Sequence, residues 1–272
     1  MPFPKIRISL FVFLILLILK ISFTNKAYSQ EKVLEIGEEL KYEVSFGFIK
    51  LGYLNFKLTG VRKEGKKIFY NTKLEVKTYP EVPFIKINEI FESEMQLEDH
   101  ALFTQKFFET NFKDRSISRT DYKFNYTKEF VKINKETDGN IELDTKVKIK
   151  ENVFYKDEIS WQYDARLNSF TNKNYNIPVF TNEDESSVRY SFNINKTFVK
   201  IEKHDYDIAV VKMEGTSDYT GFFGFKGEFL ILLSDDEERV PIKGYFNSSL
   251  GNIVCELISF KRNKWTPPAF LK

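Results

Sequence analysis

The chain has 272 residues, with 41 basic and 39 acidic side chains and a single cysteine. This length is enough for a sizeable core, and an all-β domain of this size can be a single unit. The lone cysteine excludes an intrachain disulfide. Lysine and glutamate alternate along most segments instead of clustering, so the charge pattern does not indicate a nucleic-acid-binding surface.

The first 29 residues have the three-part anatomy of a secretory signal peptide. Lys5 and Arg7 precede an apolar run over 8–19, and small residues over 27–29 precede Gln30. The run is shorter than the roughly 20 residues of a membrane-spanning helix. We expect cleavage, no membrane span afterwards, and a location in the periplasm of a Gram-negative bacterium, free or peripheral to a membrane. An uncleaved anchor is the alternative, because Phe23 extends the apolar stretch.

Removal of residues 1–29 takes away four basic side chains and no acid, which leaves 37 basic against 39 acidic residues. The mature chain therefore has a net charge of about −2 by this count. The slight positive charge of the whole sequence belongs to the export segment, and no nucleic-acid partner is expected.

Alternation with period two dominates the rest of the chain and predicts half-buried strands. In "ELKYEVSFG" the residues Leu40, Tyr42, Val44 and Phe46 share one face. The parity of the apolar residues changes at Gly52, which suggests a glycine bulge that bends the sheet. Similar patterns predict further strands over 67–79, 85–97, 101–112, 117–126, 129–135, 141–150, 187–196, 197–203, 207–215, 225–234, 240–248 and 252–260.

One segment breaks this period and predicts a single amphipathic helix within 156–170. Ile159, Tyr163, Leu167 and Phe170 recur at helical spacing, and Asp157 is available as an N-cap. Short polar turns separate the other segments, and no repeat or linker divides them. We therefore expect one β-rich domain over 30–272: a curved antiparallel sheet or partial β-barrel with one packed amphipathic helix.

Four consecutive acidic residues, 235–238, raise the question of carboxylate chemistry. They follow an uninterrupted apolar run over 229–233 and precede Val240 and Pro241, which start the next strand. Catalytic carboxyl pairs converge across a cleft from different elements. The pattern therefore favours a charged turn between two strands.

Other catalytic patterns are weak. The two histidines, His100 and His204, are isolated in polar turns, no zinc-type spacing occurs, and Cys255 lies in a predicted buried strand. The sequence thus predicts no catalytic residue, no metal site and no cofactor. Carboxylates on predicted strands keep a polysaccharide-active enzyme open as an alternative; they are Glu89, Glu92 and Asp121.

Aromatic residues give the best binding-site hypothesis. The glycines of "GFFGFKGEF" do not match a dinucleotide fingerprint, and bulky rings occupy the gaps between them. The segment is interpreted as a glycine-kinked strand or as an aromatic lip at the mouth of an apolar cavity. The residues predicted to contact a ligand are Phe222, Phe223 and Phe225 of this segment and Trp161 and Tyr163 of the helix, for which core packing is the alternative.

Three segments together resemble the exported bacterial domain-of-unknown-function family 3108. The first segment carries Gly37, Glu38, Leu40, Tyr42 and Gly52; the helix carries Arg166 and Leu167; the last carries Ser234, Asp235, Asp236, Arg239, Val240, Pro241, Gly251 and Leu257. The resemblance implies an exported, curved, β-rich envelope protein. It implies no catalytic residue, because none is defined for the family.

These observations favour a non-enzymatic envelope protein that binds an apolar or amphipathic ligand, such as a lipid, in a cavity of the curved sheet. The motivation is the aromatic excess, 16% of residues, and the absence of a catalytic pattern. Two alternatives stay open. One is a scaffold or assembly protein that contacts an envelope protein through a sheet edge; the other is the carboxylate-dependent enzyme.

Overall fold

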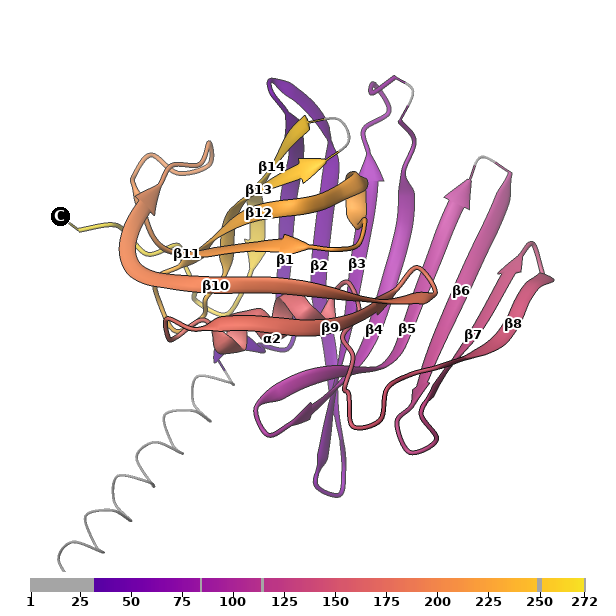
Figure 1. The fold of residues 1–272 in the computed structure, drawn as a ribbon. Coiled ribbons are helices and arrows are strands. Elements are labelled where there is room, and N and C mark those ends of the chain that lie inside the picture. Colours follow the sequence, from indigo (N-terminus) through magenta and orange to yellow (C-terminus); the bar gives the residue numbers. More distant parts are fainter. Residues whose placement is uncertain (1–31, 84, 114, 249–250, 272) are drawn as a thin grey trace, which may run out of the picture.

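The computed structural model describes residues 32–83, 85–113, 115–248 and 251–271, and within them fourteen strands form one antiparallel sheet (Figure 1). The export segment predicted over 1–29 lies outside the described residues. Strands of both halves of the chain belong to the same sheet, and its order is β8 to β1 followed by β14 to β9. The predicted fold class is confirmed: the sheet is curved and mainly antiparallel, does not close into a barrel, and, in the part of the chain that contains the described strands, carries one α-helix, over Ser160–Asn168.

The sheet consists of two meanders that meet where β1 pairs with β14. The first contains β1 (Glu39–Phe46), β2 (Ile49–Glu64), β3 (Lys67–Thr78), β4 (Asn88–Glu98), β5 (Ala101–Lys113), β6 (Ser116–Asn125), β7 (Phe130–Thr137) and β8 (Asn140–Lys148). The second contains β9 (Asn174–Thr181), β10 (Asp184–Val199), β11 (Ile208–Ser217), β12 (Phe225–Ser234), β13 (Pro241–Ser248) and β14 (Gly251–Lys261).

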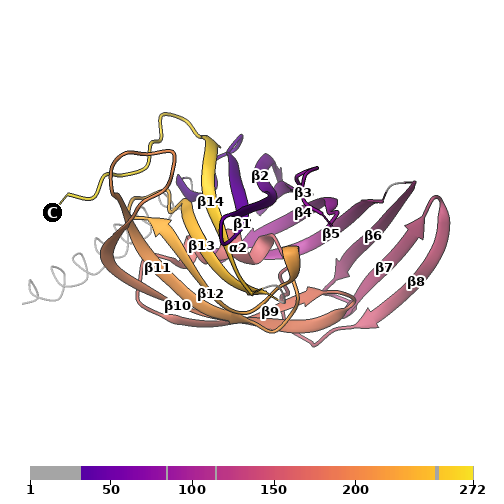
Figure 2. The same ribbon diagram turned by 90° about the horizontal axis from the view of Figure 1, so that it is seen from above.

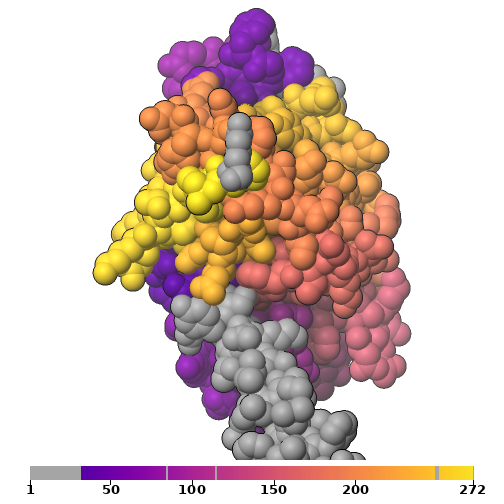
Figure 3. Space-filling model, turned by 90° about the vertical axis from the view of Figure 1, so that its left-hand side faces the viewer, coloured from indigo at the N-terminus to yellow at the C-terminus, as the bar shows by residue number. Residues whose placement is uncertain are grey.

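The two meanders face each other across the helix. In Figure 1, β10 to β12 run across the direction of β2 to β5, and Figure 2 shows the sheet curling around α2 (Ser160–Asn168). Because each strand buries alternate side chains, the concave surface is apolar along β1, where Leu40, Tyr42 and Val44 are buried as predicted. The C-terminal segment, yellow in Figure 3, pairs with the start of β11 through the Phe270 N–H donated to Asp207 O at 2.7 Å.

Helix α2 separates two apolar clusters of the core. Tyr163 packs in the larger cluster with residues of β1 to β7, whereas Trp161 and Ala165 pack in the smaller cluster with β9 to β12. Six of its nine residues are buried, including Asp164 and Arg166. The predicted packed helix is therefore confirmed, and it is buried more deeply than its spacing alone indicates, because Asp164 and Arg166 are paired inside the protein.

Asp157 stabilises the start of this helix from outside it. Its Oδ1 accepts the N–H groups of Ile159 and Ser160 at 2.7 and 2.8 Å, and its Oδ2 accepts the Thr104 hydroxyl at 2.6 Å. A carboxylate that satisfies free N–H groups before the first turn does the work of an N-cap. The cap predicted at Asp157 thus exists, although the regular helix begins three residues later.

Two strand predictions require correction. The segments 187–196 and 197–203, predicted as separate strands, belong mainly to one long strand, β10, because an irregular register between Asn193 and Thr197 bends the strand without ending it. The strand predicted over 225–234 is β12, but the residues before it do not continue it as a glycine-kinked strand, because they form a short 3₁₀ turn, η1 (Phe222–Gly224). Positive φ at Phe223 and Gly224 produces this turn.

The bulge predicted at Gly52 is confirmed. Val44 pairs with Gly52 and Ser45 pairs with Lys50, so Leu51 is the extra residue on β2. Gly52 also touches the next strand, because a Cβ added there would lie 2.1 Å from the Lys77 carbonyl oxygen. The glycine therefore allows β3 to approach a bent β2.

We expect Gly52→Ala to destabilise the fold by about 2–3 kcal/mol or more, because the added methyl group would clash with backbone atoms of Lys77 and Thr78 on the neighbouring strand. The control is Gly60→Ala on the same strand, where the nearest atom, Asn71 Nδ2, lies at 3.9 Å. Urea unfolding followed by circular dichroism measures both changes. Equal effects of the two substitutions would contradict this account of Gly52.

Candidate functional site

An apolar cavity of about 60 Å³ lies between α2 and the concave face of the sheet. Its floor is formed by side chains of β1, β2 and β11 to β14, and α2 contributes the roof. The floor residues are Leu40, Tyr42, Leu54, Phe56, Met213, Ile231, Leu233, Pro241, Lys243, Gly244, Phe246 and Cys255, and the roof residues are Gln162, Tyr163, Ala165 and Arg166. We call this space the inner cavity.

A second cavity of about 50 Å³, here the outer cavity, adjoins the first. Both are lined by Leu54, Phe56, Gln162 and Phe246, so the two spaces share walls. The outer cavity ends among polar side chains of which Lys226, Glu228 and Asn247 are exposed. The pair therefore combines an apolar interior with a polar mouth near the start of β12.

The five predicted ligand-contacting residues gather around α2 but differ in position. Trp161, Phe222 and Phe225 line the outer cavity, and Tyr163 lines the inner cavity. Phe223 lines neither. Their role in ligand binding stays a prediction, although four of the five reach a cavity wall.

The aromatic lip is packed more tightly than the sequence suggests. The Phe222 ring contacts Phe91 at 4.8 Å between centroids, and the half-buried Phe225 ring stacks on Phe246 at 4.5 Å. The Trp161 indole N–H donates to the Tyr219 hydroxyl at 2.8 Å. Most of this segment therefore packs into the cavity wall and does not form an exposed lip. This is the core-packing alternative named for these residues.

The inner cavity is lined by hydroxyl and thiol groups and by two charged side chains, Arg166 and Lys243, which are paired with Glu38 and Glu256. The Tyr42 hydroxyl donates to the Pro241 carbonyl at 2.9 Å. Burial raises the pKa of the Cys255 thiol well above its usual value, so the thiol stays protonated. Burial also raises the pKa of Tyr163 to about 12, and within the described residues its hydroxyl has no hydrogen-bond partner.

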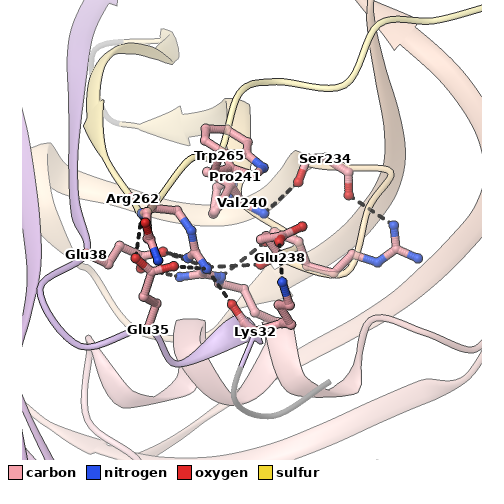
Figure 4. Close-up of polar contacts among 12 residues, drawn as sticks. Lys32, Glu35, Glu38, Ser234, Glu238, Val240, Pro241, Arg262 and Trp265 are labelled. Carbon is pink, nitrogen blue, oxygen red and sulfur yellow. Dashed lines mark hydrogen bonds and ion pairs between the residues drawn. The ribbon is translucent and has the colours of Figure 1, made fainter. Parts of the chain in front are cut away.

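A buried charged network fixes the C-terminal end of α2 (Figure 4). Arg166 donates two hydrogen bonds to the Glu38 carboxylate, at 2.7 and 2.9 Å, and Arg262 donates to the same carboxylate from the far end of β14. Arg166 also donates to the Arg239 and Glu238 carbonyls, each at 3.1 Å. The network therefore joins α2 to the start of β1, the end of β14 and the β12–β13 turn.

The four acidic residues 235–238 form part of the connection between β12 and β13, so the turn interpretation is confirmed. Asp236 Oδ1 accepts the Ser234 hydroxyl at 2.6 Å and the Arg239 N–H at 3.0 Å. Its Oδ2 accepts the Trp265 indole N–H at 2.8 Å, and the Ser234 hydroxyl oxygen accepts the Val240 N–H at 2.8 Å. These side chains shape the turn that Arg166 binds.

The strand carboxylates suggested for an enzyme do not converge. Glu89 and Glu92 lie three residues apart on β4 and so point to opposite faces of the sheet. Asp121 shares the face of Glu92, because both are registered opposite Phe108 on β5, and it pairs with Arg119 at 2.7 Å. An enzyme built on these three residues is therefore not supported by their positions.

A different set of carboxylates is electrostatically coupled on the concave side. Burial raises the pKa of Glu158 to about 8, and the nearby Glu109 adds to this shift. Burial raises the pKa of Glu109 to about 7, with a further contribution from Glu89. In the described part of the chain, no three His, Cys, Asp or Glu side chains are arranged to hold a metal ion.

The family model of proteins of unknown function DUF3108 matches residues 41–258. The chain belongs to the DUF3108 family. The resemblance of the three segments is thereby confirmed, and Glu38, Arg166 and the β12–β13 turn show how they meet in space. No curated protein matches the chain.

Two solved structures are similar to this chain. A β-barrel-like protein of domain of unknown function DUF1849 from Brucella abortus has 10% identity and a TM-score of 0.49, over 84% of this chain and 98% of its own. A protein with a YmcC-like fold from Bacteroides fragilis NCTC 9343 has 7% identity and a TM-score of 0.34, over 84% and 97% of the two chains.

Sequence reasoning missed the roles of several buried polar residues. Glu38, Arg166 and Arg239 appear in the family motifs, but nothing in the sequence indicates that they touch. Arg262 and Trp265 carry no motif, and Arg262 is 224 residues from its partner Glu38. The one sequence feature that could have indicated this network was Arg166 itself, an arginine on a helix that otherwise faces apolar strands. Among the described residues, no helix combines the length and apolar character needed to cross a membrane.

Removal of Arg166 tests the charged network. We expect Arg166→Met to lower the free energy of unfolding by about 3–5 kcal/mol, because it leaves part of a buried carboxylate uncompensated. Arg189→Met is the control: Arg189 pairs with Asp218 at 2.8 Å on the surface, and exposed pairs contribute about 0–1 kcal/mol. Similar losses for both variants in urea unfolding would contradict a structural role for the network.

The raised pKa of Glu158 predicts a pH-dependent stability. Its value in an unfolded chain is near 4.5, but in the fold the carboxyl keeps its proton up to about pH 8. Between these pH values the folded protein binds more protons, so the free energy of unfolding falls as pH rises. Each unit of pKa shift corresponds to about 1.4 kcal/mol, and the total is of order a few kcal/mol.

Glu158→Gln is expected to reduce this downward slope between pH 5 and pH 8 and to stabilise the protein at pH 8. The amide oxygen still accepts the Thr181 hydroxyl, which donates to Glu158 at 2.6 Å. Glu92→Gln, at an exposed position, is the matched control. An unchanged slope in Glu158→Gln, measured by urea unfolding at both pH values, would show that this carboxyl is ionised in the fold.

Proposed function

We propose that this protein is an exported, non-enzymatic envelope protein that binds an amphipathic ligand, with an apolar chain of the ligand under α2. The observation that carries the proposal is the pair of adjoining cavities with apolar walls and a polar mouth. Ligand sites in proteins usually combine apolar walls with a few placed polar groups. The anatomy of residues 1–29 supports export.

The size of the cavities limits the ligand. Pockets for drug-sized molecules measure about 300–1,000 Å³, whereas the inner and outer cavities measure about 60 and 50 Å³. A water-sized group needs roughly 10–15 Å³ on this scale, so the two cavities together hold a chain of roughly eight carbons. A whole lipid does not fit. The proposal is therefore that the end of one acyl chain occupies the cavities while the polar part stays at the mouth.

The polar mouth gives the ligand a direction. Lys226, Glu228 and Asn247 can hydrogen-bond a polar group in water, and Phe56 and Phe229 line the apolar space behind them. Transfer of each methylene group from water into such a space contributes about 0.8 kcal/mol. An amphipathic molecule gains most from binding with its chain inward.

A scaffold role is the second candidate, and the free edge of β8 favours it. The edge of β9 is bridged by Lys156 at Val179, but β8 is the terminal strand of the sheet on the other side, and Ile141 is 66% exposed there. A partner strand could add to this edge. The bulge opposite Glu136 and the outward lysines of β8 are features that protect edges from such pairing, so this candidate ranks second.

Mass spectrometry of an organic extract from protein purified without detergent tests the ligand proposal. We expect a stoichiometric acyl-chain compound in the wild type and at least about tenfold less in Ala165→Leu, because three added carbons fill the inner cavity at a cost of about 2 kcal/mol in lost burial. Ala101→Leu makes the same change at an exposed site.

Empty extracts from folded wild-type protein, or equal amounts of the compound in Ala165→Leu and Ala101→Leu, would contradict binding under α2. An empty extract together with a stable complex that is lost on substitution of β8 residues would favour the scaffold role.

A further inference from the structure

The Tyr163 hydroxyl is a buried polar group without a partner. Only 3% of this residue is exposed, and within the described chain no protein atom accepts or donates a hydrogen bond at its oxygen. Tyr163 lines the inner cavity, whose walls are otherwise mainly apolar. Buried hydroxyl groups are nearly always hydrogen-bonded, because leaving one unpaired costs much of its desolvation free energy.

The neighbouring polar groups are already engaged elsewhere. The Tyr42 hydroxyl donates to Pro241 O, and the Gln162 amide nitrogen donates to Glu158 O at 3.0 Å. Arg166 lies against the Tyr163 ring, 5.5 Å from its centroid, and its N–H groups bind Glu38 and the β12–β13 turn. The Tyr163 hydroxyl is therefore an unpaired donor on a residue that lines the inner cavity, and the Tyr42 hydroxyl and the Arg166 guanidinium beside it are bonded to other groups.

Resting on the proposed function, we propose that the ligand carries a neutral oxygen acceptor in its buried part, which accepts a hydrogen bond from the Tyr163 hydroxyl. An ester, ketone or amide carbonyl within an acyl chain has this chemistry. A carboxylate does not fit, because burial of an unpaired anion is very costly and the two cations that line the cavity, Arg166 and Lys243, are compensated by Glu38 and Glu256. The site thus selects an oxygen-bearing chain over a plain hydrocarbon.

Methyl NMR of protein labelled with [¹³C-methyl]methionine reports on the inner cavity directly. Met213 lines this cavity, whereas Met95 is buried in the larger core cluster and does not line either cavity, so it is an internal reference. Titration with 2-hexanone and with n-hexane compares an acceptor-bearing probe with a plain chain of similar size. The shift of the Met213 methyl resonance gives both affinities.

We expect Tyr163→Phe to weaken 2-hexanone binding roughly fivefold to tenfold, as loss of one neutral hydrogen bond implies, and to leave hexane binding unchanged. Tyr42→Phe is the matched control: its hydroxyl lies on the same cavity but is already bonded, so the ratio of the two affinities should stay as in the wild type. An unmoved Met95 resonance shows that each variant is folded.

Two other outcomes are distinguishable. If both probes shift Met213 but the affinity ratio is the same in wild type and Tyr163→Phe, the cavity binds chains and the role of Tyr163 is wrong. If neither probe shifts Met213 in the wild type, the binding cavity itself is refuted, and the inference fails with the proposed function.

Discussion

The ion pair between Glu38 and Arg166 is the constraint on which the arrangement of this protein depends. The two residues are 128 positions apart, and both side chains are almost fully buried. Arg262 joins the same carboxylate from the last strand of the sheet. One carboxylate thus holds the helix and both ends of the folded chain at the line where the two meanders meet. Buried ion pairs contribute little net stability compared with apolar packing. Their role here is to fix the position of α2, because Arg166 must reach Glu38 and the β12–β13 turn at the same time.

The cavities follow from this way of placing the helix. Arg166 ties the end of α2 to Glu38 and to the β12–β13 turn. Its neighbours on the inner side, Gln162 and Ala165, leave the space below them unfilled. Across the gap, Leu54, Phe56 and Met213 present apolar surface. A helix held by packing alone would move toward the sheet until such a gap closed, because atoms that line a void lose dispersion contacts. A helix held by charges at one end can leave the gap open, and this apolar gap beside a polar mouth is where we propose that the ligand binds.

The local features of this fold could be predicted from the sequence, and the long-range ones could not. Alternation gave most strands, the bulge beside Gly52 and the turn after Ser234, because each depends on residues close together in the chain. The helix was found from its spacing, but its depth was not, since Asp164 and Arg166 read as solvent-facing until their partners are known. The aromatic residues around α2 were identified by composition and position. The burial of Glu158, the pairing of Arg262 and the unpaired hydroxyl of Tyr163 could not be predicted, because each depends on contacts between segments far apart in sequence.

If the charges at the end of α2 hold open an apolar cavity beneath the helix, that cavity should take up xenon, and a crystal structure under xenon pressure tests this most directly. Empty apolar cavities take up xenon, whereas polar cavities fill with ordered water. We predict xenon in the inner cavity, in contact with Leu54, Phe56 and Met213. A cavity that has collapsed, or one that excludes xenon and holds ordered water instead, would contradict the account.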